Sequence, residues 1–196
     1  MIKKILLIII ISLISFCMYK IYTNITIINL PEGELKWSNI RPKNAKLCIP
    51  AAFSSKTNEV EGGYMINGKS SKINNKYKIS LIKDTFIINK SWKSNNGFQQ
   101  IILVKDNKPI KFKNSIKKCF RRALCKKDGK AFLIESNYPM TMAKFSEYCS
   151  MYCSDAIYLD MGEYGYGYIK KCGITVPLFI WALFSKHKQT NWLYIV

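Results

Sequence analysis

The sequence predicts an α+β domain, of mixed α/β type, in which a single mixed β-sheet carries few packing helices. Three observations support this fold class. Several segments rich in β-branched and aromatic residues are separated by turn residues, only one segment has helical periodicity, and an apolar run precedes them all. A length of 196 residues suits one domain with a short N-terminal hydrophobic anchor.

Residues 1–24 are predicted to be a signal anchor or a signal peptide. Lys3 and Lys4 precede an apolar run from Ile5 to about Tyr19, and Lys20 closes it. No small-residue cleavage site follows, which favours an uncleaved signal anchor over a cleaved signal peptide. Because lysines before an apolar segment favour a cytoplasmic N-terminus, residues 25–196 are expected to form a membrane-anchored, extracytoplasmic domain, periplasmic or on the cell surface.

The middle of the chain reads as strands and turns. "KYKISLIKDTFIINK" (76–90) predicts a strand, and "NNGF" (95–98) predicts a turn. "QQIILVKDNKPIKF" (99–112) predicts two strands joined by a turn at Asp106-Asn107. "FRRALCKKDGKAFLIES" (120–136) predicts the clearest hairpin, because Asp128-Gly129 supplies a turn with positive φ.

One amphipathic helix is expected after Pro139, with Thr141 as its N-cap and apolar side chains at helical spacing. "DAIYLD" (155–160) follows as a short strand. "ITVPLFIWALF" (174–184) is too short to span a membrane and predicts a buried strand or irregular core. "TNWLYIV" (190–196) predicts a final strand.

The formal net charge is +19, which favours anionic partners such as phosphorylated glycans, nucleic acid or acidic lipid. The lysines are scattered, however, and the sequence shows neither a basic helix nor a sheet with exposed aromatic residues. Nucleic acid is therefore not an expected partner.

Seven cysteines leave disulfides and buried free thiols both open for this domain. Cys17 lies in the predicted anchor, and an exported domain allows the other six to pair. Cys149, Cys153, Cys172 and His187 lack the second closely spaced pair of a zinc site, so no metal is expected. The glycines at 162, 165 and 167 lack the spacing of a dinucleotide fingerprint, and no cofactor is expected.

Charged side chains stand where two of the predicted strands end. Glu135 ends "AFLIE" and Asp160 ends "AIYLD". A right-handed helical connection would bring both acids to the same edge of the sheet, although either acid alone is often only a solvated strand end. Arg121 and Arg122 lie on the strand paired with "AFLIE" and point to opposite faces, so one of them can face the acids. Carboxylates beside a guanidinium suit hydrolysis of a glycosidic or phosphate bond.

The order of these features resembles the phosphodiester glycosidase domain family, which includes the N-acetylglucosamine-1-phosphodiester α-N-acetylglucosaminidase. "RRALCKKDGKAFLIES", "YPMTMAKFSEY" and "SDAIYLDMGEYGYGY" match its arginine strand, its helix start and its strand ending in Asp-Gly-Gly. Upstream, "CIPAAFSSKTNEVEGGYMINGK" and "FQQIILVKDNKPI" extend the resemblance over about residues 45–170. This chain has Glu135-Ser136 in place of Asp-Gly, and Met161 in place of a glycine.

The resemblance implies a hydrolase that cleaves a sugar from a sugar-1-phosphodiester or a related glycan. Arg121 falls on the family's arginine, with Arg122 replacing Thr or Ser, and Glu135 and Asp160 fall on its two aspartates. Asp160 and Glu135 are then catalytic, and Arg121 or Arg122 holds the phosphate. Further candidates for substrate binding are Gln100, Gly162 and Asn191. The alternative is a non-catalytic envelope- or glycan-binding module anchored to the membrane.

Overall fold

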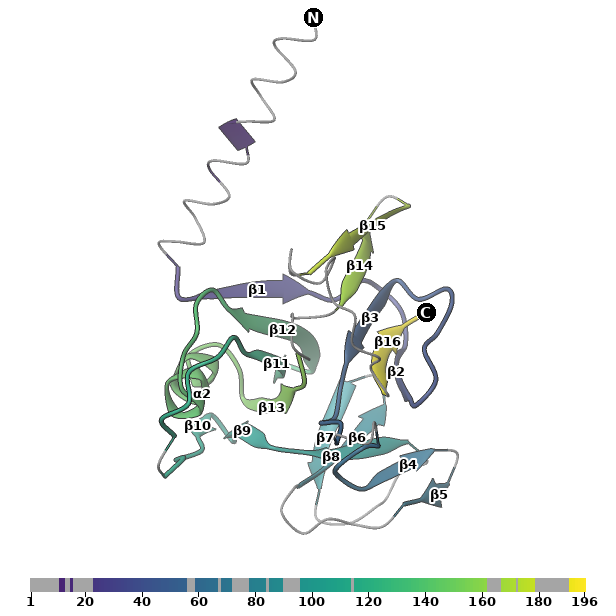
Figure 1. Ribbon diagram of the computed structural model, residues 1–196, viewed down its shortest axis with the longest axis horizontal. Helices are drawn as coiled ribbons and strands as arrows, with labels where there is room; N and C mark the ends of the chain where they lie inside the picture. Colours follow the sequence, from purple (N-terminus) through teal and green to yellow (C-terminus); the bar gives the residue numbers. More distant parts are fainter. Residues whose placement is uncertain are drawn as a thin grey trace, which may run out of the picture.

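The structure of the protein is a computed structural model. It describes residues 11–12, 15, 23–55, 59–66, 68–71, 78–83, 85–89, 96–113, 115–161, 167–171, 173–178 and 191–196, with the backbone only for 78–83 and 85–89. These residues form sixteen strands in three sheets and the helix α2 (Met142–Ser150). Figure 1 shows the three sheets side by side, with α2 at the edge far from the C-terminus.

Every hydrogen-bonded strand pair in the three sheets is antiparallel. In order across each sheet, the first sheet contains β1 (Ile25–Asn29), β12 (Lys130–Ser136), β11 (Arg122–Lys127), β13 (Asp155–Leu159), β9 (Ile102–Lys105) and β10 (Lys108–Pro109). The second contains β15 (Ile174–Pro177), β14 (Tyr168–Lys171), β3 (Leu47–Pro50), β16 (Trp192–Ile195) and β2 (Leu35–Ser38). The third contains β5 (Lys69–Ser70), β4 (Tyr64–Ile66), β8 (Gly97–Gln100), β6 (Lys78–Lys83) and β7 (Thr85–Asn89).

The prediction of an α+β domain, with a single mixed sheet and few packing helices, is wrong. The described chain is mostly strand, divides into three sheets, and has a single helix packed on one of them. The physical reason lies in the connections. Strands joined by tight turns, such as β11 and β12, pair antiparallel, and the helix α2 connects β12 to β13, which lies on the other side of β11.

The local elements agree closely with the turn and cap residues. Asp106 and Asn107 have φ of 51° and 62° between β9 and β10, and Asp128 has φ of 50° in the hairpin of β11 and β12. The Thr141 hydroxyl accepts a hydrogen bond from the Lys144 backbone N–H, which confirms the predicted N-cap. The final strand is confirmed as β16, whereas the region 76–90 is two strands, β6 and β7, rather than one.

The prediction of a buried strand or irregular core at 174–184 is wrong for its first half. β15 is an edge strand of the second sheet, with Ile174 67% exposed and Val176 40% exposed. Residues 179–184 lie outside the described residues, as does most of the predicted anchor. Within the described part of the chain, no helix combines the length and the apolar character needed to cross a membrane.

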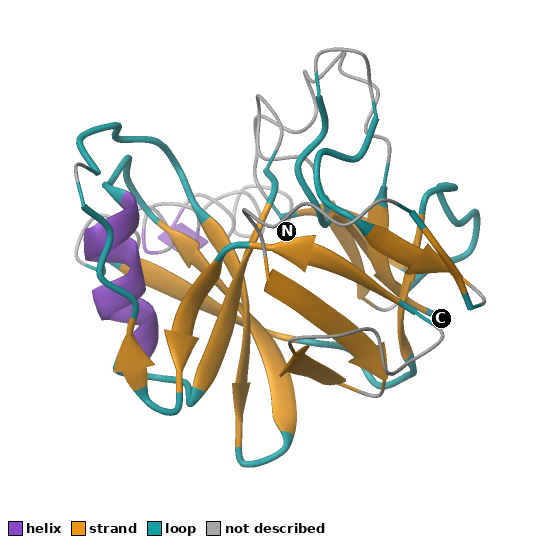
Figure 2. Ribbon diagram, turned by 90° about the horizontal axis from the view of Figure 1, so that it is seen from below, coloured by secondary structure: helices purple, strands orange, loops and turns teal. Residues whose placement is uncertain are grey.

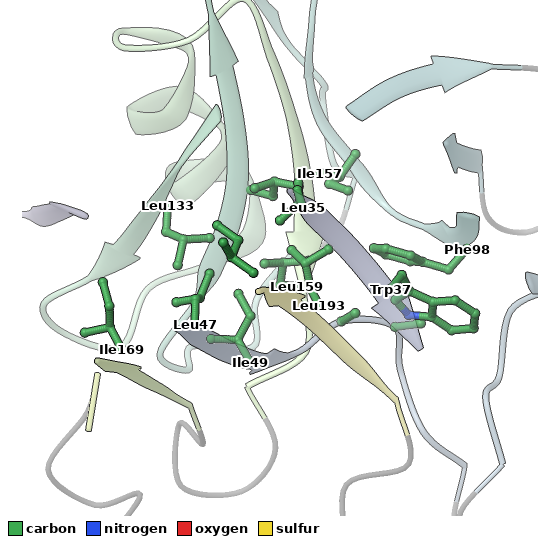
Figure 3. Packing of buried hydrophobic residues seen from close by; sticks show 14 residues of the cluster. Leu35, Trp37, Leu47, Ile49, Phe98, Leu133, Ile157, Leu159, Ile169 and Leu193 are labelled. Atoms are coloured by element: carbon green, nitrogen blue, oxygen red, sulfur yellow. The ribbon is translucent and has the colours of Figure 1, made fainter. Parts of the chain in front are cut away.

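The larger core lies between the first and second sheets (Figure 3). The first sheet contributes Leu124, Leu133, Ile157 and Leu159, and the second contributes Leu47, Ile49 and Leu193. Trp37 stacks on Phe98 with ring centroids 5.8 Å apart, which joins the third sheet to the same core. Fully burying each such side chain stabilises the fold by about 1.5–3 kcal/mol, so this core fixes how the sheets face each other.

The opposite face of the first sheet packs against α2, which Figure 2 shows beside the strands. Phe145 and Cys149 on the helix are buried against Ala123, Cys125 and Tyr158 on the sheet. Among the described cysteines Cys48, Cys119, Cys125, Cys149 and Cys153, all five are free thiols, while Cys17 and Cys172 lie outside the described residues. The first sheet is therefore covered on both faces, and this decides where each charged side chain can go.

Candidate active site

Four of the predicted site residues, Arg121, Arg122, Glu135 and Asp160, lie at one end of the three central strands of the first sheet. Arg122 pairs across the ladder with Glu135 of β12 and with Leu159 of β13. Asp160 follows Leu159 directly. Because β11 is antiparallel to both neighbours, β12 and β13 run in the same direction and end at the same edge. The two acids therefore lie at one end of the sheet, on either side of the strand that starts at Arg122.

Arg122 and Glu135 form a buried ion pair. The Arg122 Nε donates to the Glu135 Oε1 at 2.6 Å, and the two side chains are 0% and 3% exposed. Their strand neighbours Leu124 and Leu133 belong to the core between the first and second sheets, so the pair lies on that face. An ion pair so completely buried holds β11 against β12 and seals the end of the core.

Gly167 lets the second sheet approach this pair. A Cβ built on Gly167 would lie 2.8 Å from Cγ2 of Ile49 and 3.2 Å from Nη1 of Arg122. Its φ of +146° also suits glycine alone. The backbone at the start of β14 therefore passes directly over the guanidinium, and any side chain here would displace it.

Arg121 points to the opposite face, toward α2. Its Nε donates to the Met140 carbonyl at 2.8 Å, and Nη2 donates to the Lys117 carbonyl at 2.9 Å. Its guanidinium lies 5.8 Å from the centre of the Tyr158 ring. Among the residues that the structure describes, no carboxylate lies within ion-pair distance of Arg121. Two neutral carbonyls thus hold this cation.

Asp160 lies on the same side as Arg121. Leu159 shares the face of its cross-strand partner Arg122, and continued alternation takes the next side chain to the other face. Burial raises the pKa of Tyr158 well above its usual range, and the Asp160 charge raises it further while Arg121 opposes the shift. Asp160 is partly exposed, and its backbone N–H donates to the Ala51 carbonyl at 2.9 Å.

The two arginines and the two acids therefore separate into two sets. From the sequence, one arginine is expected to face both acids, but Arg122 pairs with Glu135, while Asp160 lies on the face of Arg121. Arg121, on which the resemblance places the phosphate-binding role, accompanies Asp160 and Tyr158 instead. The Arg122–Glu135 pair and the group of Arg121, Tyr158 and Asp160 thus lie at the same end of the first sheet, on opposite faces.

Gln100 and Asn191 bind the backbone at Ala51 and Ala52. The Asn191 Oδ1 accepts from the Ala52 N–H at 2.6 Å, and its Nδ2 donates to the Ala52 carbonyl at 3.0 Å. The Gln100 Nε2 donates to the Ala51 carbonyl at 3.4 Å. Both side chains are fully buried, and they anchor the segment that contacts Asp160. Gly162 lies outside the described residues.

Sequence reasoning missed three contributors: Ala51, Tyr158 and Gly167. The Ala51 carbonyl links Asp160 to Gln100, the tilted rings of Tyr158 and Phe53 have centroids 5.4 Å apart, and Gly167 covers Arg122. Tyr158 carried a usable signal, because it lies two residues before Asp160 and so shares its face. The contacts of Ala51 and Gly167 depend on pairings distant in sequence and had no local signal.

The described residues contain no cluster of three His, Cys, Asp or Glu side chains suited to holding a metal ion. Asp160 is a group that can transfer a proton, and the cation Arg121 on the same face suits an anionic group. No protein-family model matches the chain, and no curated protein matches it either.

Proposed function

We propose that the protein is a membrane-anchored, extracytoplasmic hydrolase similar to phosphodiester glycosidases, which cleaves a sugar from a sugar-1-phosphodiester or related glycan. The observation that carries the proposal is the strand register. It brings Arg122 opposite Glu135 and Leu159, and so gathers Asp160 and Arg121 at the same sheet end. This is the set of residue types that the sequence resemblance assigns to the reaction.

Asp160 is the group that we assign to proton transfer. It is partly exposed, whereas Glu135 is only 2% exposed and is occupied by Arg122. A general acid or base must come within hydrogen-bond reach of the atom that it protonates or deprotonates, which favours Asp160. Glu135 then keeps Arg122 in place and fixes the strand end from which Asp160 and Arg121 project.

Arg121 is the group that we assign to the phosphate of the substrate. Its guanidinium is held by two backbone carbonyls, and the residue is only 4% exposed, so the segments that cover it would have to open for a phosphate to reach it. Tyr158 beside it is un-ionised at neutral pH, as an ordinary tyrosine is, and burial raises its pKa further. The residue is 6% exposed, and its hydroxyl can donate a hydrogen bond to an anion that reaches it. An arginine fixed in this way suits a phosphate better than a lysine, since its planar fork can bind two oxygens.

The purified full-length chain should release sugar from UDP-GlcNAc or from methyl and aryl sugar-1-phosphodiesters. Asp160→Asn keeps the size of the side chain but removes its acid–base function, so we expect turnover to fall about 10²–10⁴-fold. Asp155→Asn is the matched control, because Asp155 lies at the other end of β13 and pairs with Lys126 at 3.3 Å. Undiminished turnover in Asp160→Asn would refute the catalytic assignment.

A second candidate is a non-catalytic module that binds an anionic glycan. The burial of the Arg122–Glu135 pair favours it, because a carboxylate enclosed in the core is typical of a structural ion pair. The net charge of +19 suits an anionic polymer. In the same assay this module would bind the sugar phosphodiesters with salt-sensitive affinity and release no sugar.

A further inference from the structure

The start of the described domain is clamped where the predicted anchor ends. The Asn137 Nδ2 donates to the Thr23 carbonyl at 2.9 Å and to its Oγ1 at 2.8 Å, and the Asn137 N–H donates to the Asn24 carbonyl at 3.1 Å. The Tyr138 hydroxyl donates to the Asn24 Oδ1 at 2.8 Å. These bonds fix the orientation of the chain as it enters β1.

This clamp lies close in sequence to the apolar run. Lys20 closes the run and Thr23 is already bound, so the connection spans at most about 10 Å. If residues 5–19 are in a bilayer, as the proposed location requires, the surface around Tyr138 lies within reach of the lipid headgroups. The domain would then present one particular face to the membrane.

That face carries side chains suited to a membrane surface. We call Tyr138, Lys144 and Tyr148 the tyrosine–lysine patch. The Lys144 Nζ lies 5.6 Å from the Tyr138 ring centre and 5.9 Å from that of Tyr148. Hydrogen bonding to Tyr138 raises the pKa of Lys144, so the ammonium stays charged. Tyrosine and lysine are the residues that proteins place at the headgroup level.

More basic and apolar residues adjoin the patch. The Ser115 hydroxyl accepts from the Met142 N–H at 2.9 Å, which places the segment 115–118 beside the start of α2. Ile116 there is 87% exposed, and Lys117 and Lys118 are exposed beside it. Glu147 is the acid near the patch, so the local charge remains positive. Figure 1 shows α2 on the same side of the molecule as the start of β1.

We propose that the tyrosine–lysine patch rests on the anionic headgroups of the bilayer that holds the N-terminal segment. The hydrogen bonds at Thr23 and Asn24 orient the patch toward the lipid, and the lysines bind the headgroup phosphates. The proposal rests on the membrane-anchored location, but not on catalysis. Its consequence is that α2 lies at the membrane while the third sheet faces away from it.

The test uses the full chain reconstituted into vesicles of phosphatidylcholine alone, or of phosphatidylcholine with a quarter of phosphatidylglycerol. Amide hydrogen exchange is followed for peptides covering 137–148 and, as a remote reference, 64–71. We expect slower exchange at 137–148 in the anionic vesicles only, with no change at 64–71.

Variants test whether the charge of the tyrosine–lysine patch causes the slower exchange at 137–148. Lys144→Gln removes one cation near the surface and should weaken docking about fivefold, with a matching loss of protection. Lys69→Gln is the control, since exposed Lys69 on β5 lies at the opposite edge of the molecule in Figure 1. Tyr148→Trp adds a second readout, because brominated lipid should quench its fluorescence.

The possible failures are distinguishable. A full chain that does not float with vesicles would overturn the location and the patch together. A chain that floats but shows equal exchange in neutral and anionic vesicles would overturn the patch alone. A chain that releases no sugar in solution would contradict the proposed hydrolase activity and would not bear on the proposal about the patch.

Discussion

Breaking the Arg122–Glu135 ion pair should destabilise the fold far more than breaking an exposed ion pair. Glu135→Gln removes the negative charge and leaves the Arg122 guanidinium, 0% exposed, in the core. Removing one partner of a buried ion pair costs about 3–5 kcal/mol. For a domain of this size, that corresponds to a fall in Tm of about 6–20 °C.

The assay is urea unfolding followed by tryptophan fluorescence, with the midpoint and slope fitted separately. Glu34→Gln is the matched control, because Glu34 forms a 2.8 Å ion pair with Lys36 whose side chains are 60% and 38% exposed. Breaking that exposed pair should cost about 0–1 kcal/mol. The double variant Arg122→Met, Glu135→Leu should recover most of the loss, since replacing a whole buried pair with apolar residues is often neutral or stabilising.

A cost below about 1 kcal/mol for Glu135→Gln would refute this reasoning. It would mean that water reaches the guanidinium and that the pair is not enclosed by the core. Glu135 would then be accessible to a substrate and could serve as a second catalytic carboxylate. The experiment therefore also bears on the role of Glu135 in the proposed reaction.

Two further predictions concern the same sheet end. Gly167→Ala should destabilise the fold by about 1–3 kcal/mol from backbone strain, and by about as much again from contact with Ile49 and Arg122. Gly129→Ala is the control, because Gly129 has a φ of +76° with open space around it, and it should cost only about 1–2 kcal/mol. Equal losses of stability for the two variants in chemical denaturation would contradict the close approach at Gly167. Tyr158→Phe should flatten the loss of stability above pH 10. Burial raises the pKa of Tyr158 above its ordinary 10.0, so its neutral form stabilises the fold at lower pH, and this contribution is lost as the pH rises through the ionisation of the unfolded chain. Parallel stability profiles for the two proteins at alkaline pH would contradict that assignment.

Turn and cap chemistry made much of the local structure predictable. Asp128 and Asp106 take the positive φ that their turns require, and Thr141 caps α2 as its sequence position indicates. These features depend on a few consecutive residues, so a single sequence contains all the information needed. From the sequence, Glu135 and Asp160 are also expected to lie at the same edge, because a helix connects their two strands, and β12 and β13 do end at the same edge.

The number of sheets was not predictable in this way. β3 pairs with β16, and β1 pairs with β12, across most of the chain. Such pairings depend on how the apolar faces of entire sheets pack together, and no short segment of the sequence contains that information. The exposed apolar edge strand β15 shows the same limit, because Ile174 and Val176 have the composition of a core strand but lie on the surface.

The choice between adjacent arginines is the most instructive limit. Alternation shows that Arg121 and Arg122 face opposite ways, but it cannot say which face each acid takes. That depends on the parity between Glu135 and Arg122 across the ladder, which the predicted Asp128-Gly129 turn sets, so the information lies in the hairpin and not in alternation alone. Once the parity is known, Glu135 belongs to the face packed on the second sheet, and Asp160 belongs to the face of Arg121, which packs on α2. A strand end that looked like one paired-carboxylate site thus separates into a buried ion pair that maintains the geometry and a partly exposed acid that is placed to react.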